Sequence, residues 1–349
     1  MRILFLPKYH NEGPSSRYRT HKYIQYFKES GHEVSVKPLF RDNYVKNLYS
    51  GNKNTILSKV IDYVSRARYL FKRGKDFDLL IIEKELFPYI PYIFEKMLLN
   101  NKNYTLDYDD AISVRYKNKA FISSIFRNKI NSLARESTLV TVGNHWYWSE
   151  IQYGKLHYLP TVIDINDYPL SKGFLKNNNK PIIVWIGSPA TVKYLNVLTN
   201  ILLKLSKNYD FKLRIIGAKI HIDELDIECL SWSSEKEFEY IYESDIGIMP
   251  LLNSEWEKGK CGFKIIQYMA ASLPVVASDS PANNEIIIND ETGYIAKNEQ
   301  DWYDYLEKLI VSSEMREVLG HAGRMRVEGE YTYQAWGNRY IEILENYMS

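Results

Sequence analysis

Short apolar runs and segments with helical spacing alternate along most of the chain. The apolar runs carry few polar residues, which is typical of strands buried on both faces of a parallel sheet. Helical spacing follows several of them, for example at Tyr23, Ile24 and Phe27. This alternation predicts an α/β protein built from repeated βα units. The expected strands span residues 3–6, 33–39, 78–82, 104–108, 139–143, 182–186, 212–217, 227–232, 246–250 and 273–277.

The chain has 349 residues, which is longer than one hydrophobic core usually supports. A second series of βα units begins at Ile182, after the polar stretch 171–180. We therefore expect a first domain over 1–165, a second over 166–330 and a terminal helix over 331–349. Doubly wound sheets bind ligands at the carboxyl ends of their strands, so the loops that follow the strands are the places to search for a site.

Composition and charge fit an ordinary soluble enzyme. Lys and Arg total 45 against 43 Asp and Glu, and a net charge of +2 is no overall signature of nucleic-acid binding. The two cysteines, Cys229 and Cys261, lack metal-type spacing, so a reduced cytoplasm is the expected compartment. No apolar run approaches the ~20 residues of a membrane span. No cofactor or metal is expected, and any phosphate recognition must be local.

The stretch 255–285 carries the strongest signal for such a local site. Gly262 directly precedes a segment with helical spacing, whose free N–H groups and positive end would favour an anion. Lys264 lies in the first helical turn, where a cation is unfavourable against the helix dipole, and Lys258 and Lys260 add charge nearby. This crowding suggests a phosphate partner. The alternative is an ordinary surface helix with a lysine whose stem lies along it.

A resemblance favours the first interpretation. Residues 260–270 spell Lys-Cys-Gly-Phe-Lys-Ile-Ile-Gln-Tyr-Met-Ala, and Pro-Val-Val-Ala-Ser follows at 274–278. This phrase resembles the donor-binding signature of the retaining GT-B glycosyltransferases of family 4. Most members carry two Glu residues at the positions of Gly259 and Gln267. Both carboxylates are therefore missing here, and ribose binding would fall to the Gln267 amide, which can donate and accept hydrogen bonds.

The resemblance implies further donor-binding residues. Family members carry Gly-Arg after the first strand of the second domain and a Lys five residues later; here Gly187 is followed by Ser188, and Lys193 stands at the Lys position. Lys264 would supply the charge that Ser188 lacks. Trp232 follows its strand where the family encloses the base, so it either stacks on the base or belongs to the core. The remaining residues assigned to the donor are Gly13, Lys260, Gly262 and Glu285.

In the first domain, two adjacent carboxylates follow an expected strand. Residues 106–111, Leu-Asp-Tyr-Asp-Asp-Ala, resemble an Asp-x-Asp-Asp-Ala motif of the same family variant, which implies a catalytic role for Asp109 and Asp110. A helix cap is the alternative. Because adjacent carboxylates repel, one of them is expected to have a raised pKa and to accept a proton. Arg17 and Arg19, at the start of a helix, are candidates for binding an acceptor or for an ion pair with another domain.

A basic segment over 59–75 mixes Lys59, Arg66, Arg68, Lys72, Arg73 and Lys75 with apolar residues. Such a helix either lies on an anionic membrane surface or presents a solvated face. A location at the inner face of the cell membrane is therefore one of two possibilities.

The resemblance implies a GT-B fold, with two Rossmann-like domains facing each other across a cleft and a terminal helix that returns to the first domain. It also implies a metal-independent hexosyl- or deoxyhexosyltransferase that acts with retention. The donor would be a UDP-, GDP- or dTDP-sugar, and the acceptor a glycan or polyprenyl-linked precursor of a cell-surface polysaccharide. A decayed sugar-binding scaffold is the alternative. A dinucleotide-dependent oxidoreductase is disfavoured because Gly-x-Gly-x-x-Gly follows neither first strand.

Overall fold

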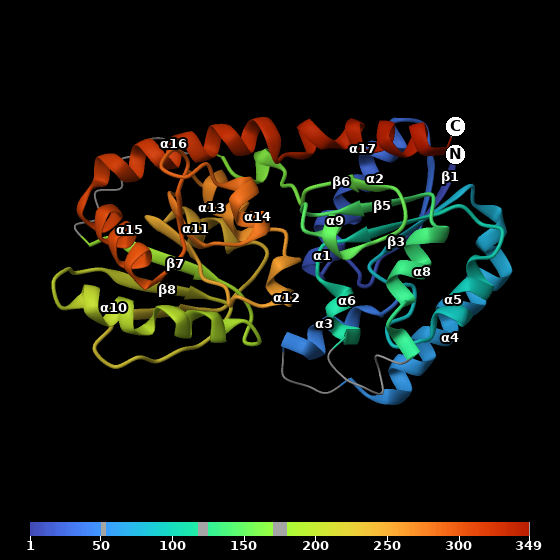
Figure 1. Cartoon of the computed structure of the whole chain (residues 1–349), viewed down its shortest axis with the longest axis horizontal. Helices are drawn as coiled ribbons and strands as arrows, with labels where there is room; N and C mark the ends of the chain where they lie inside the picture. Colours follow the sequence, from blue (N-terminus) through green and yellow to red (C-terminus); the bar gives the residue numbers. More distant parts are fainter. Residues whose placement is uncertain (50–53, 118–124, 170–179, 349) are drawn as a thin grey trace. The chain divides into compact units, whose positions relative to one another are not determined.

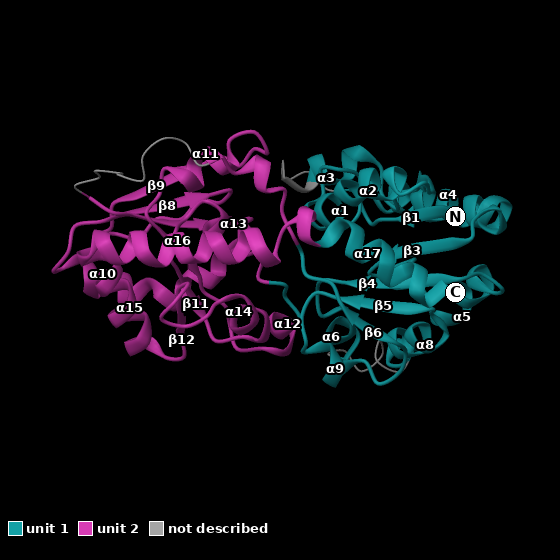
Figure 2. Cartoon of the chain, turned by 90° about the horizontal axis from the view of Figure 1, so that it is seen from above, with its two compact units in different colours: residues 1–161, 259–261, 336–349 teal, residues 162–258, 262–335 magenta. Residues whose placement is uncertain are grey.

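The structure is a computed structural model that describes residues 1–49, 54–117, 125–169 and 180–348 (Figure 1). Most of the polar stretch expected between the domains therefore lies outside the described residues. The chain forms two compact units (Figure 2). Unit 1 contains residues 1–161, 259–261 and 336–349, and unit 2 contains residues 162–258 and 262–335. The assignment of 259–261 to unit 1 differs from the expected division, which placed these residues in the second domain.

Unit 1 is built on a parallel sheet of six strands in the order β2-β1-β3-β4-β5-β6. Every pair of neighbours is parallel, so all the carboxyl ends lie along one edge of the sheet. The central strands are buried because they are covered on both faces, as their continuous apolar sequence predicts. The strands are β1 (Arg2–Leu6), β2 (Glu33–Val36), β3 (Leu79–Glu83), β4 (Tyr104–Tyr108), β5 (Leu139–Val142) and β6 (Leu156–Tyr158).

Helices and 3₁₀ segments connect these strands. The α-helices of unit 1 are α1 (Pro14–Arg19), α2 (Ile24–Glu29), α3 (Asp42–Tyr49), α4 (Ile56–Arg73), α5 (Tyr92–Leu99), α6 (Ile112–Lys117), α8 (Lys129–Glu136) and α9 (Tyr147–Glu150), and 3₁₀ turns span His21–Tyr23 and Gly74–Asp76. Most of helix α17 (Tyr333–Met348) also belongs to unit 1, where the Tyr340 ring packs edge-on against Tyr23 and Phe27. The terminal helix thus packs on the first unit.

Unit 2 repeats the architecture, with the parallel order β12-β11-β10-β7-β8-β9. The order reverses at β7, whose neighbours are β10 and β8, and such a switch point is where doubly wound sheets bind ligands. The strands are β7 (Ile182–Ile186), β8 (Lys212–Ile216), β9 (Ile227–Leu230), β10 (Ile246–Met249), β11 (Val275–Ser278) and β12 (Tyr294–Ala296). Neither β6 nor β12 was among the predicted strands. Both strands have only three residues, too few for a periodic pattern to be recognised.

The sheet of unit 2 lies between two apolar clusters. Along β7, Val184 and Ile186 belong to the cluster that contains α13, whereas Ile183 and Trp185 belong to the cluster that contains α10 and α15. This alternation follows from the two-residue period of a strand. The helices are α10 (Thr199–Ser206), α11 (Glu237–Tyr242), α12 (Glu255–Lys258), α13 (Phe263–Ala270), α14 (Pro281–Ile286), α15 (Glu299–Val311) and α16 (Ser313–Glu330), with 3₁₀ segments at Ile165–Asp167 and Val192–Leu198.

No helix among the described residues is both long and apolar enough to span a bilayer.

Candidate functional site

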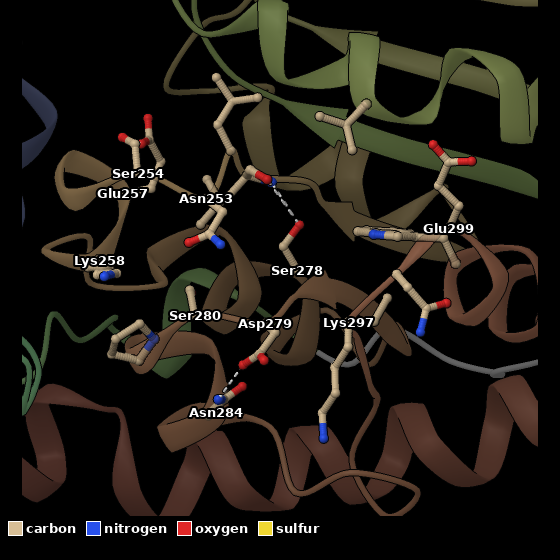
Figure 3. A pocket seen from close by; sticks show the side chains of 17 residues that line it. Asn253, Ser254, Glu257, Lys258, Ser278, Asp279, Ser280, Asn284, Lys297 and Glu299 are labelled. Carbon is tan, nitrogen blue, oxygen red and sulfur yellow. Dashed lines mark hydrogen bonds between the residues drawn. The ribbon is translucent and has the colours of Figure 1, made fainter.

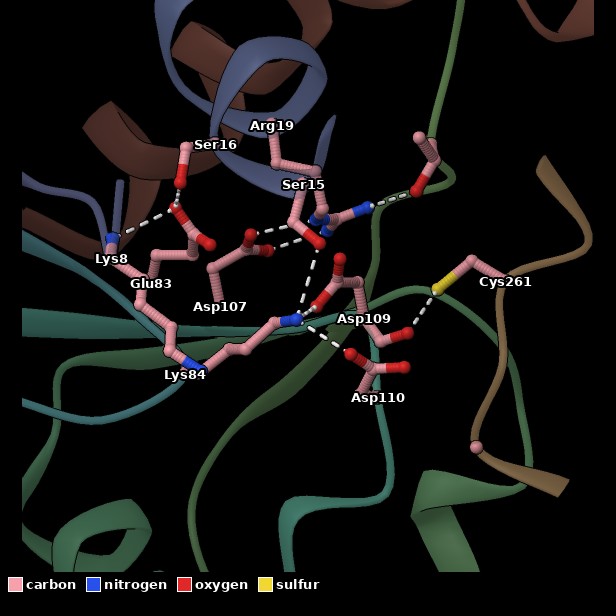
Figure 4. A network of polar contacts seen from close by, with 12 residues as sticks. Lys8, Ser15, Ser16, Arg19, Glu83, Lys84, Asp107, Asp109, Asp110 and Cys261 are labelled. Atoms are coloured by element: carbon pink, nitrogen blue, oxygen red, sulfur yellow. Dashed lines mark hydrogen bonds and ion pairs between the residues drawn. The ribbon is translucent and has the colours of Figure 1, made fainter. Parts of the chain in front are cut away.

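A polar network lies at the carboxyl ends of β1, β3 and β4 in unit 1 (Figure 4). Lys84 follows β3 directly and adopts a positive φ of 60°, which is uncommon for a residue with a side chain. Its Nζ lies 2.9 Å from Asp109 Oδ1 and 2.6 Å from Asp110 Oδ2, and it donates a hydrogen bond to Ser15 Oγ at 3.2 Å. One buried ammonium group therefore joins the two predicted catalytic carboxylates.

Lys84 also determines the electrostatics of this pair. Burial alone would raise the pKa of Asp109, but the Lys84 ammonium, with a further contribution from Arg19, lowers it below the ordinary value. Burial alone would lower the pKa of Lys84, but Asp109 and Asp110 hold it well above its usual range. The expected proton acceptor with a raised pKa is therefore not Asp109. Lys84 was not among the predicted site residues, although its place directly after a buried strand was a usable signal.

The carboxyl group with a raised pKa is Glu83, the last residue of β3. Burial raises its pKa from 4.5 to about 7, against the opposing effect of Lys84. Its Oε2 accepts hydrogen bonds from Ser16 Oγ at 2.6 Å and from the Lys8 N–H at 3.2 Å. Glu83 therefore holds both ends of the loop between β1 and α1. Sequence analysis missed this residue as well.

Arg19 is a structural residue in this network. Its Nε and Nη2 donate to the two carboxylate oxygens of Asp107 at 2.7 and 2.5 Å, and its Nη1 donates to Leu159 O and Thr161 Oγ1, both at 3.0 Å. The side chain is buried, so the expectation that Arg19 contacts an acceptor is wrong. Its partners are the bidentate carboxylate and carbonyl that a buried guanidinium requires.

The other predicted residues of the N-terminal loop lie nearby. Arg17 is half-buried in α1, and its Nε donates to Asn11 O at 2.9 Å. Gly13 is the N-cap residue of α1 and is buried. Neither observation tests a role in binding an acceptor or a donor.

Residues 259–261 contribute to the same region of unit 1. Lys260 Nζ lies 3.9 Å from Asp110 Oδ1, and the Cys261 thiol donates to Asp109 O at 3.1 Å. A Cβ atom at position 259 would lie only 2.7 Å from the Ala111 backbone nitrogen. The backbone at Gly259 thus touches the backbone directly after Asp109 and Asp110. Most members of the resembling family carry a glutamate at this position.

In unit 2, the predicted anion site is built around the start of α13. Gly262 is its N-cap residue with a positive φ of 64°, which glycine adopts without strain. Lys264 is the second residue of the helix, as predicted, and its Nζ lies 4.7 Å from the centroid of the Trp185 ring. Trp185 lies on β7, two residues before Gly187. The Ile186 N–H donates to the Tyr268 hydroxyl of α13 at 3.0 Å, which fixes this helix against the end of β7.

The loop after β7 holds the remaining predicted phosphate ligands. The Ser188 N–H donates to Thr191 Oγ1 at 3.0 Å, forming a closed turn. Lys193 follows on the adjacent 3₁₀ segment, where it is exposed and lies 5.6 Å from the Tyr194 ring centroid. Lys264 lies on α13, and this loop follows β7. The hydrogen bond between Ile186 and Tyr268 joins these two elements at the switch point.

Gln267 belongs to a cluster that sequence analysis only partly identified. Its amide Nε2 donates to Glu237 Oε1 at 2.5 Å and to the Tyr168 hydroxyl at 3.3 Å. The indole N–H of Trp232 donates to the other oxygen of Glu237. The structure therefore brings the predicted Trp232 and Gln267 together through a carboxylate that was not among the predicted site residues. Glu237 is the first residue of α11, where a carboxylate is favoured by the helix dipole.

Glu285 lies apart from this cluster, on α14. Its carbonyl oxygen accepts hydrogen bonds from Arg326 Nη2 at 2.9 Å and from the Tyr331 hydroxyl at 3.2 Å. These contacts fix the backbone of α14 against α16, and they leave the predicted donor contact of the side chain untested.

A pocket of about 490 Å³ lies at the carboxyl ends of β10, β11 and β12 (Figure 3). The loop at 278–284, which follows β11, forms one wall. The other polar lining residues are Asn253, Ser254, Glu257, Lys258, Lys297, Asn298 and Glu299. Lys264 and Gln267 do not line it. Within the part of the chain that the structure describes, no group of three or more His, Cys, Asp or Glu side chains is placed to hold a metal ion.

Comparison with known proteins finds similarity to glycosyltransferases. Residues 180–312 match the family model described as "Glycosyl transferases group 1". The chain is also 25% identical over 224 residues to the capsular polysaccharide biosynthesis glycosyltransferase CapM of Staphylococcus aureus. That match covers 61% of this chain and 57% of CapM. The family match lies over the part of the chain that carries α13, Gln267 and the loop after β7.

Solved structures share the fold over the whole chain. Sucrose-phosphate synthase from Thermosynechococcus elongatus matches with a TM-score of 0.74 at 12% identity, covering 99% of this chain and 98% of that one. Anabaena Alr3699/HepE in complex with UDP-glucose matches with a TM-score of 0.71 at 13% identity, covering 99% and 100%. At these identities the likeness concerns the fold alone. The chain therefore has the GT-B fold.

Proposed function

We propose that the protein is a glycosyltransferase that moves a sugar from a nucleotide-sugar donor to a glycan or a lipid-linked glycan precursor. The observation that carries the proposal is the coincidence in unit 2 of the family match with a lysine-bearing helix N-terminus at the sheet's switch point. CapM, the curated relative, acts in capsular polysaccharide biosynthesis, and HepE was solved with UDP-glucose. These names support a cell-surface glycan product and a UDP-linked donor among the three candidates.

The donor diphosphate would bind at the start of α13. Lys264, Lys193 and the N–H groups of the first turn of α13 would stabilise the negative charge that develops on the leaving nucleoside diphosphate. Preorganised cations and helix N-termini perform this role without reorganisation. We propose that the transfer needs no metal ion and that it retains the anomeric configuration, as in the family that the sequence resembles.

The nucleoside would lie against the cluster of Trp232, Glu237 and Gln267. Because the Gln267 amide already donates to Glu237, its carbonyl oxygen and the Glu237 carboxylate are the acceptors that this cluster offers to ribose hydroxyls. Glu237 would thus provide the carboxylate that the family pattern carries at position 267.

The acceptor hydroxyl would be bound by Asp110 in unit 1. The Asp110 side chain is 27% exposed, compared with 10% for Asp109, so it is the more accessible member of the pair. Asp109 would hold the Lys84 ammonium, and Lys84 with Lys260 would orient the Asp110 carboxylate. Under this assignment Asp110 accepts a hydrogen bond from the incoming hydroxyl, while Asp109 and Lys84 are positioning residues.

The proposed location is the cytoplasmic face of the cell membrane. The supporting feature is α4, which covers most of the basic segment 59–75 and exposes Arg68, Lys72 and Arg73. Arg66, which was expected on this basic face, is instead buried, and its guanidinium donates to the carbonyl oxygens of Pro7, Lys37 and Leu86.

The decisive experiment is a screen of UDP-, GDP- and dTDP-sugars by thermal shift, followed by an assay for sugar release and transfer. A donor that binds the folded protein raises its apparent stability by RT ln(1 + [L]/Kd). Turnover of one donor supports the enzyme. Binding without hydrolysis or transfer to any offered acceptor would identify the scaffold instead, and no binding of any nucleotide-sugar would refute both.

A further inference from the structure

Helix α4 turns apolar side chains to solvent as well as to the core. Its inward face places Leu70 in the core of unit 1 but also carries Asp62 and Arg66, both buried, with Asp62 accepting from Arg41 Nε at 2.6 Å. Its outward face carries six exposed large apolar side chains, including Leu57 at 70% and Phe71 at 83% exposure. A helix of a soluble domain normally turns its apolar stripe to the core. The outward residues are Ile56, Leu57, Val60, Ile61, Val64 and Phe71.

The neighbouring helix extends this surface. Helix α5 contacts α4, and the two lie together at one edge of unit 1 in Figure 1. Three apolar side chains of α5 are exposed, namely Ile93, Phe94 and Met97. We call these nine side chains the α4–α5 apolar surface. Exposed apolar side chains gathered on two helices that contact each other indicate a docking surface.

The charges beside this surface select its partner. Arg68, Lys72 and Arg73 are exposed on α4, whereas Asp62, the only acidic residue of that helix, is buried. Arg73 forms an ion pair with Asp76, so Arg68 and Lys72 are the cations that α4 offers to a partner. A helix with an apolar stripe and flanking cations lies in the plane of an anionic bilayer, with its stripe ~5–10 Å into the boundary between headgroups and acyl chains.

We infer that the α4–α5 apolar surface inserts into the interfacial layer of an anionic lipid bilayer. The inference deepens the membrane location proposed above, because the sequence suggested only adsorption of a basic helix onto anionic headgroups. Insertion makes the apolar side chains the main source of affinity and the lysine and arginine side chains a second, salt-sensitive one.

The test is flotation of the full chain with vesicles of phosphatidylcholine alone and with vesicles that also contain phosphatidylglycerol. We expect wild-type protein to bind both, more strongly with phosphatidylglycerol, and to keep most of its binding in high salt. The double variant Leu57→Ser/Phe71→Ser should lose at least tenfold on both vesicles. Arg68→Gln/Lys72→Gln should lose only the increment that phosphatidylglycerol adds.

Val311→Ser/Val318→Ser is the matched control, because both valines are similarly exposed, at 65% and 61%, but lie on α15 and α16 of unit 2. Equal losses in the control, binding abolished by salt alone, or no vesicle binding by wild type would overturn the inference. A wild-type dimer in lipid-free solution that Leu57→Ser/Phe71→Ser converts to a monomer would identify a second copy as the occupant and overturn it too.

Each variant is also assayed for sugar transfer to a soluble acceptor. Failure of vesicle binding with transfer intact contradicts only the membrane inference, and vesicle binding without any nucleotide-sugar turnover contradicts only the proposed enzyme.

Discussion

The two units place their candidate residues at equivalent edges of similar sheets, but they hold the charges differently. In unit 1, Lys84 is buried against Asp109 and Asp110, and Arg19 is buried against Asp107, so cations and anions neutralise one another. In unit 2, Lys264 is half-buried with its ammonium group near the Trp185 ring, and Lys193 is exposed. The charges of the unit 1 network are therefore tied to stability, whereas these two lysines lie at positions that a ligand can reach.

The largest effect should come from removing the shared cation of unit 1. Lys84→Met keeps the length of the side chain but leaves two carboxylates in a buried site without their counter-charge. Loss of one member of a buried ion pair costs ~3–5 kcal/mol. We expect this loss in urea unfolding at pH 7, together with loss of transfer. Lys193→Met, which removes an exposed lysine of unit 2, should leave the unfolding free energy unchanged. Equal stability of the two variants would remove the contrast between the units.

Lys264→Ala tests the proposed donor site of unit 2. If Lys264 stabilises the leaving diphosphate, its removal should cost ~2–4 kcal/mol of transition-state stabilisation, by analogy with a lost oxyanion donor. Nucleoside-diphosphate affinity should fall as well, while the unfolding free energy stays near that of wild type. Kinetics and calorimetric titration measure the two effects. Unchanged turnover and affinity in both Lys264→Ala and Lys193→Ala would remove these lysines from the donor site.

Glu83 gives unit 1 a dependence on pH. Its pKa is about 7 in the folded protein and about 4.5 in the unfolded chain. As the pH rises, the unfolded chain therefore loses this proton at a lower pH than the folded protein does. Stability should therefore be highest below pH 4.5 with respect to this group and fall as pH rises to about 7, by about 3 kcal/mol at most. Glu83→Gln keeps an oxygen acceptor for Ser16 and Lys8 and should remove this decline. Glu95 has a similarly raised pKa of about 7, so the difference between variant and wild type isolates Glu83.

Gln267→Leu tests the nucleoside cluster of unit 2. Leucine would leave Glu237 and the ribose hydroxyls without an amide partner, at a cost of ~1–3 kcal/mol in nucleotide binding. The double variant Gln267→Glu/Glu237→Gln should bind nucleotide better than Gln267→Leu. The second substitution is included because two adjacent carboxylates would repel each other. Equal nucleotide affinity in the leucine and the double variant would mean that Gln267 does not contact the ribose.

The sequence predicted the two βα series because buried parallel strands leave continuous apolar runs, as at Ile3–Leu6 and Ile182–Ile186. It also located Lys264 and the carboxylate pair, since both lie beside recognisable phrases. It did not identify Lys84 or Glu237, because their roles depend on contacts with residues far away in the chain, at Asp109 and Gln267. Arg19 was misassigned for the same reason. A basic residue at a helix start does not reveal that Asp107, on β4, lies within hydrogen-bond distance.

The smallest effect should come from the more accessible carboxylate of unit 1. Asp110→Asn keeps the shape of the side chain and removes its charge, so an acceptor hydroxyl loses its proton acceptor while Asp109 still balances Lys84. We expect transfer to fall at least tenfold, which corresponds to about 1.4 kcal/mol, with nucleotide affinity and unfolding free energy near wild type. Asp109→Asn should instead lose stability along with activity, because Asp109 is the more buried partner. If Asp110→Asn transfers sugar at the normal rate, or if it loses stability as Asp109→Asn does, the pair is structural and unit 1 contributes no reacting group.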